Sequence, residues 1–165
     1  RLIGCYHAIG LGVDAVAFLD ADNWYGPNHI ADLLAAMDEK RADFVSSGRT
    51  LCRLDGSVMG ACPLTDPERF IDTNAMLFGR QAFHQLHHWV LMPSYGHLIG
   101  DRIMLNHVQR SKLKRHHLNQ GSVFYRCAKE GLYRQMGEVI PEGVQPRPDY
   151  EASFRQWEAD GQPPL

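Results

Sequence analysis

The sequence has no long hydrophobic run and no large excess of either charge. Nothing in its 165 residues approaches the roughly 18 to 20 consecutive apolar residues of a membrane-spanning helix, and no signal-peptide pattern opens it. The 17 Lys and Arg residues nearly balance the 19 Asp and Glu residues, which gives a net charge of −2. This balance predicts no nucleic-acid partner. We expect a cytoplasmic protein, and any attachment to the inner face of a membrane would come from outside this segment.

Cysteine is scarce and has no paired C-x-x-C spacing. A zinc ribbon and a dense disulfide framework are therefore both disfavoured, and a reducing compartment fits best. The hydrophobic content of 44% and the length indicate one domain with a real core. The four cysteines are Cys5, Cys52, Cys62 and Cys127.

The two ends of the chain differ in character. Residue 1 is Arg rather than an initiator Met, and Leu2, Tyr6 and Ile9 have the spacing of a helix that feeds a strand, so we expect the chain to begin within a domain. Five of the nine prolines fall in residues 141–165. We therefore predict a domain over residues 1–140 and a Pro-rich tail over 141–165, extended or partly helical, with a short helix around 150–159.

Between the ends, helical and strand patterns alternate. Apolar residues at i, i+3, i+4 and i+7 predict a helix that begins after Gly26-Pro27. Strands are expected at residues 13–19, 43–53, 57–61, 70–78 and 122–127, and further helices at 79–90 and 101–108. The basic residues of 110–117 suggest a solvated face. The pattern is that of an α/β domain.

The most informative segment is an apolar run that ends in Asp20-Ala21-Asp22. Such a run indicates a buried strand, and ligands of open α/β sheets bind at the carboxyl ends of strands. Two carboxylates spaced i, i+2 can face one hard cation such as Mg²⁺ or Mn²⁺. They are also common in ordinary solvated turns, so neighbouring motifs must decide.

Several ordered motifs together resemble the family 2 glycosyltransferases, which have the GT-A fold. Residues 1–4 (Arg-Leu-Ile-Gly) precede the strand that ends in Asp20-Ala21-Asp22, residues 72–80 look like the central acceptor-side strand, and Gly100-Asp101-Arg102 looks like the later acidic motif. The resemblance covers residues 1–126. It implies a Rossmann-like, mixed, mostly parallel sheet with flanking helices, without the family's first nucleotide-binding strands.

The resemblance also implies an activity: inverting transfer of a sugar from a nucleotide diphosphate sugar, UDP- or GDP-linked, to a saccharide, lipid or protein acceptor. In this interpretation Asp22 and Asp20 hold Mn²⁺ or Mg²⁺, with His117 as a candidate third ligand, and Asp101 is the general base. Each of these residues also has an ordinary reading as a cap, a surface ion pair or a core residue. Donor-binding candidates are Arg1, Asp20, Asp22 and Arg126, and candidates for binding sugar or acceptor are Asp72, Asn74 and Trp24.

Two other interpretations remain open at this point. A haloacid dehalogenase-like phosphatase would use Asp20 as its nucleophile. A non-catalytic remnant would keep the fold and bind a nucleotide sugar or a partner chain without turnover. An incomplete sheet would leave an exposed edge, so self-association through that edge is a further hypothesis, which sedimentation velocity would test.

Overall fold

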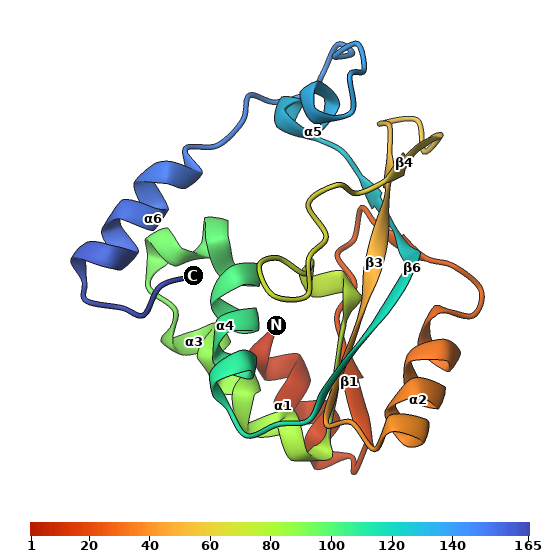
Figure 1. The fold of residues 1–165 in the computed structure, drawn as a ribbon, viewed down its shortest axis with the longest axis vertical. Helices are drawn as coiled ribbons and strands as arrows, with labels where there is room; N and C mark the ends of the chain where they lie inside the picture. The colour runs from red at the N-terminus through yellow and green to blue at the C-terminus, as the bar shows by residue number, and fades with distance from the viewer.

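The computed structural model describes residues 1–165, and a six-stranded sheet lies at its centre (Figure 1). The strands are β1 (Ala15–Ala17), β2 (Trp24–Tyr25), β3 (Phe44–Cys52), β4 (Val58–Ala61), β5 (Met76–Gly79) and β6 (Arg115–Arg126). The α-helices are α1 (Leu2–Gly10), α2 (His29–Lys40), α3 (His88–Leu91), α4 (Gly100–Arg110), α5 (Glu130–Gln135) and α6 (Tyr150–Ala159). Three 3-10 helices complete the fold: η1 (Thr73–Ala75), η2 (Arg80–His87) and η3 (Ser94–Ile99).

The sheet has the strand order β1-β5-β3-β6-β2, with β4 paired to β3. The predicted mixed α/β sheet with flanking helices is confirmed. Strands β1, β3 and β6 run in one direction, but β3 and β6 are the only directly paired parallel strands. The reason is that β5 enters between β1 and β3 in the opposite sense. Because of this insertion, the residues that follow β1 lie beside the residues that precede β5.

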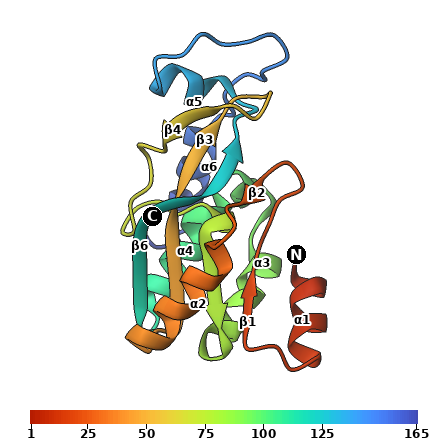
Figure 2. The same ribbon diagram turned by 90° about the vertical axis from the view of Figure 1, so that its right-hand side faces the viewer.

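Helices cover both faces of the sheet. In Figure 1, α2 lies on one side and α1, α3 and α4 lie on the other, and Figure 2 shows β1 beside α1 at the sheet edge. Since successive strand residues point to opposite faces, Val45 packs with Leu33 of α2, whereas Phe44 joins Ile103 of α4 in the main core. None of the helices is long and apolar enough to cross a membrane. All four cysteines are buried and free.

Most predicted elements are present, and the exceptions have local causes. The strand predicted at 70–78 begins only at Met76, because the Asp72 side chain accepts a hydrogen bond from the backbone N–H of Asn74 (2.8 Å) and caps η1. The helix predicted at 79–90 is mostly 3-10. At its end, Nδ1 of His87 donates to the carbonyl of His84.

The last strand is much longer than predicted. It begins at Arg115, within the basic stretch expected to be a solvated face, because parallel pairing with β3 extends along its whole length. Helix α6 occupies the residues predicted for it, and its Trp157 is buried against the core. The boundary predicted between the domain and the tail at residue 141 stays a prediction.

Candidate active site

The site begins where β1 ends and β5 begins. Their antiparallel register pairs Ala17 with Leu77, and the same register continued for three residues places Asp20 opposite Asn74. The backbone N–H of Asp20 donates to Oδ1 of Asn74 (2.6 Å), and Nδ2 of Asn74 donates to Oδ2 of Asp20 (3.1 Å). Two positions that are 54 residues apart in the sequence are thus joined by side-chain bonds that continue the strand pairing.

Asp72 forms the buried floor of this group. Its carboxylate pairs with the guanidinium of Arg49, and both side chains are almost fully buried, at 4% and 5% exposure. Its Oδ1 also accepts from the Asn74 side chain at 2.6 Å. The Arg49 guanidinium lies 4.2 Å from the ring centre of Tyr125 and 5.0 Å from that of Phe70. The charge of Asp72 is therefore fully compensated, and Asn74 links it rigidly to Asp20.

Asp101 lies in the first turn of α4, beside the same group. The Thr73 hydroxyl donates to its Oδ1. Burial raises the pKa of Asp101 to about 7 and the charge of Asp72 acts in the same direction, while the Thr73 bond and the cations Arg49 and Arg1 oppose the rise. A carboxyl group that exchanges its proton near neutral pH is suited to act as a general base.

Arg1 completes the group from the start of the chain. Its guanidinium lies 2.5 Å from Oδ1 of Asp20 and 4.8 Å from the ring centre of Trp89. The structure therefore brings five of the predicted site residues into one connected group: Arg1, Asp20, Asp72, Asn74 and Asp101.

The turn after Asp20 presents a free carboxylate. Asp22 is exposed and its side chain makes no hydrogen bond or ion pair, whereas Asn23 is buried and accepts from the backbone N–H of Arg126 (2.9 Å). The Arg126 guanidinium stacks over Trp24 at 5.6 Å, and its Nε is buried without a partner. Trp24 in turn stacks on Phe124, with ring centres 5.6 Å apart. Arg126 and Trp24 thus lie beside the Asp22 turn.

This turn fits a metal held jointly by protein and substrate. No group of three or more His, Cys, Asp or Glu side chains converges on one point. Mg²⁺ is usually bound by one or two carboxylates together with substrate phosphates and waters, so the free carboxylate of Asp22 suits that arrangement. Asp20 is less available, since both of its oxygens already have partners.

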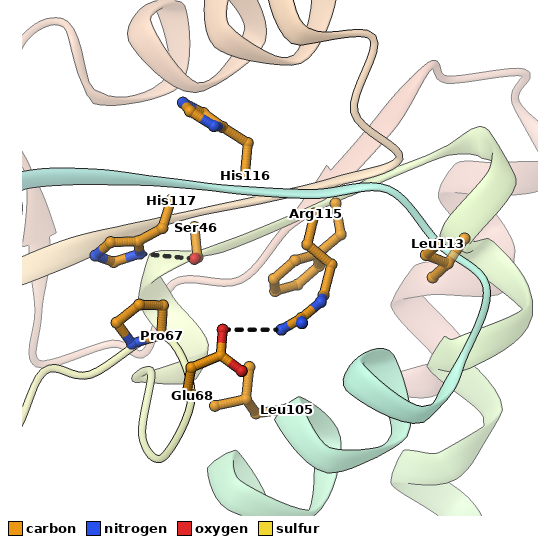
Figure 3. Close-up of a pocket in the computed structure, with 9 residues that line it drawn as sticks. Ser46, Pro67, Glu68, Leu105, Leu113, Arg115, His116 and His117 are labelled. Carbon is orange, nitrogen blue, oxygen red and sulfur yellow. Dashed lines mark hydrogen bonds and ion pairs between the residues drawn. The ribbon is translucent and has the colours of Figure 1, made fainter.

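The structure does not bring His117 to this turn. His117 lies near the start of β6, opposite Ser46 of β3, whereas the Asp22 turn meets the other end of β6 at Arg126. Nδ1 of His117 is hydrogen-bonded to the Ser46 hydroxyl (2.9 Å) in a separate cavity of about 400 Å³, where Arg115 pairs with Glu68 at 3.6 Å (Figure 3).

Two residues of the site were missed by sequence reasoning. Thr73 carried no signal beyond its place between Asp72 and Asn74. Arg49 did carry one, because it is a single charged residue within a run otherwise suited to a buried strand, and such a charge needs a buried partner.

Comparison with known families agrees with this geometry. The model of the family described as Glycosyl transferase family 2 matches residues 1–109, which contain Asp20, Asp72 and Asp101. A comparison with curated proteins found no match. The family match covers well over half of the chain, and the mixed sheet with flanking helices is consistent with it. The chain therefore belongs to glycosyl transferase family 2.

Proposed function

We propose that this domain catalyses inverting transfer of a sugar from a nucleoside diphosphate sugar to an acceptor hydroxyl. The observation that carries the proposal is the connected group of Asp20, Asn74, Asp72 and Asp101 at the junction of β1, β5 and α4. It places a carboxyl group that can change protonation state near pH 7 beside the turn of the Asp20-Ala21-Asp22 motif.

The donor side is the turn that carries Asp22. Arg1 and Arg126 are the nearby cations for the diphosphate oxygens, and Arg is well suited to phosphate because its planar group donates in pairs. A divalent ion, Mg²⁺ or Mn²⁺, held by Asp22 and the diphosphate would neutralise the negative charge that develops on the leaving group. Family membership supports a nucleotide-sugar donor, and a UDP- or GDP-sugar is the specific form we propose.

The acceptor side is Asp101. Thr73 binds its Oδ1, which leaves Oδ2 to take the proton of the acceptor hydroxyl. The acceptor oxygen then forms a bond to the anomeric carbon as the bond from that carbon to the diphosphate breaks. Attack comes from the face opposite the diphosphate, so the configuration at that carbon inverts.

The phosphatase interpretation has lost its support. The family match assigns the chain to sugar transfer, and both oxygens of Asp20 are engaged by Arg1 and Asn74 rather than presented as a nucleophile. A domain that binds a nucleotide sugar without turnover is the remaining alternative, and it predicts binding without transfer.

Calorimetry on the full 165-residue chain tests the proposal. UDP, GDP and their common sugar conjugates are titrated with and without Mn²⁺. We expect one nucleotide to bind in a metal-dependent manner, and Asp22→Asn to weaken its binding at least about tenfold. Substitution of a residue that only supports a metal ligand often lowers metal affinity about 10- to 100-fold, and loss of a ligand should cost at least as much. Asp38→Asn, an exposed aspartate on α2, is the matched control.

The outcomes separate the alternatives. Metal-dependent binding with a loss in Asp22→Asn supports the donor site, and formation of a glycoside product on donor turnover supports catalysis. Binding without any turnover would favour the non-catalytic alternative. Metal-dependent hydrolysis of p-nitrophenyl phosphate, with no nucleotide binding, would overturn the proposal in favour of the phosphatase.

A further inference from the structure

Four half-buried aromatic side chains lie on the loop before Asp72, on β6 and on α6, and most of them come from beyond the residues that the family model matches. Phe70 lies within the matched part, but Tyr125 on β6, and Tyr150 and Phe154 on α6, lie outside it. Each of these rings is partly exposed rather than sealed in the core.

Two of these rings, Phe70 and Phe154, are arranged around the charged residue that follows Asp101 in α4. The guanidinium of Arg102, the next residue in α4, lies 5.2 Å from the ring centre of Phe70 and 5.7 Å from that of Phe154. Arg102 therefore joins α6 to the loop that precedes Asp72. Aromatic rings of this kind contribute packing area together with an electrostatic attraction for the cation.

Helix α6 is held firmly in this position. The Ser153 hydroxyl donates to the carbonyl of Tyr95 in η3 (2.9 Å), and the Trp157 side chain is 3% exposed, with its Nε1 donating to the carbonyl of Pro163 (2.6 Å). The Asp149 side chain caps the helix by accepting from the N–H of Ala152 (2.9 Å). Figure 1 shows the chain leaving α5, arching away and returning as α6 on the side of the sheet that carries α4.

Tyr125 lies against the buried ion pair, because the Arg49 guanidinium is 4.2 Å from its ring centre. Burial raises the pKa of Tyr125, Arg49 opposes the rise, and Asp72, Asp101 and Tyr150 all add to it. Tyr125 therefore interacts electrostatically with both the candidate base and the first residue of α6.

We propose that Tyr150 and Phe154 of α6 form an aromatic platform for the acceptor, and that the acceptor is a saccharide. The inference rests on the proposed transfer reaction. A sugar ring has an apolar face of C–H groups and an edge of hydroxyls, so it suits aromatic rings on α6 next to Arg102, the residue that follows Asp101. A lipid chain would need a continuous apolar surface, which the surrounding charges interrupt.

Saturation-transfer NMR on the full chain tests this platform. The probes are the methyl glycosides of glucose, galactose, mannose and N-acetylglucosamine, each titrated in the presence of UDP and Mg²⁺. We expect at least one glycoside to bind. Its Kd should rise about five- to tenfold in Tyr150→Leu and in Phe154→Leu, as expected for the loss of one aromatic contact.

The variants keep an apolar side chain, so the packing of α6 should be preserved, and far-UV circular dichroism checks the fold. Tyr6→Leu, which removes an exposed tyrosine of α1, is the matched control and should leave binding unchanged. Unchanged glycoside affinity in both α6 variants overturns the platform, as does a chain that binds UDP but no glycoside, or one that binds a serine tripeptide or octyl chain instead. Failure to bind UDP is a separate result, which counts against the proposed donor site.

Discussion

The buried pair of Arg49 and Asp72 provides the sharpest test of how the site is built. Asp72→Asn removes the carboxylate charge while keeping the side-chain shape. The Arg49 guanidinium, 5% exposed, would then be left without its counter-charge in the protein interior. Breaking a buried pair from one side costs about 3–5 kcal/mol of folding free energy, because the remaining charge has lost both water and partner.

That free energy corresponds to a large thermal shift. A chain of this length loses about 2–4 °C in Tm per kcal/mol, so we expect Asp72→Asn to melt about 6–20 °C below the unmodified protein. Urea unfolding followed by circular dichroism gives the free energy directly. The midpoint should fall while the slope stays constant, because the surface exposed on unfolding does not change.

Two further variants make the test specific. Combining Arg49→Met with Asp72→Asn removes both charges and should recover much of the lost stability, as buried pairs replaced by neutral groups often do. Asp14→Asn breaks the exposed pair with Arg80 and should cost less than about 1 kcal/mol. If Asp72→Asn costs no more than Asp14→Asn, or if the double variant is no more stable than the single one, the argument from charge burial is wrong.

The other predictions concern Asp101, the packing of β3 on β6, and a glycine of α1. Burial, aided by Asp72, raises the pKa of Asp101 to about 7 from an ordinary 3.8. The transfer rate should therefore be half-maximal near pH 7 and level off roughly one pH unit higher, and Asp101→Asn should lower the rate about 10²- to 10⁴-fold. The folding stability should change with pH in the opposite direction. The stability that the protonated Asp101 carboxyl contributes is fully present below about pH 4 and is lost as pH rises through about 7. Asp101→Asn should therefore be more stable than the unmodified chain in urea at pH 8. A Cβ at Gly121 would lie 2.8 Å from Oγ1 of Thr50 and 3.2 Å from the Arg49 carbonyl carbon, so Gly121→Ala should cost about 1–3 kcal/mol. Gly4→Ala, in open space within α1, should instead gain about 1 kcal/mol, and thermal melts of both variants check the contrast.

The parts of the fold that local patterns determine could be predicted from the sequence. Helix α2 follows from apolar spacing after Gly26-Pro27, and β3 follows from its long run of strand-forming residues. The extent of β6 could not be predicted, because its basic first residues become a strand only through pairing with β3. Nor did the spacing of residues 79–90 indicate that most of this helix would be 3-10.

The sequence named most residues of the candidate site one by one, but it did not show that they would lie together. Asp20 and Asp101 carried motif signals, and residues 72–74 resembled a family strand. That Asp20 meets Asn74 depends on the insertion of β5 between β1 and β3, which no local pattern encodes. The same holds for His117: its place in a basic stretch gave no indication of how far along β6 it lies from the Asp22 turn.

The buried ion pair of Arg49 and Asp72 positions the candidate site, which leaves proton transfer to the candidate base Asp101. A single carboxylate could not perform both tasks. Asp72 raises the pKa of Asp101 and Arg49 lowers it, so the two effects oppose each other. Burial is the largest cause of the raised pKa of Asp101. Meanwhile the Asp72 carboxylate holds Asn74, and Asn74 holds the end of β1 at Asp20. The ion pair therefore serves mainly to fix the geometry between the Asp22 turn and the candidate base. Asp101 can then keep a pKa suited to proton transfer, at a cost in stability, without that cost loosening the strands that position it.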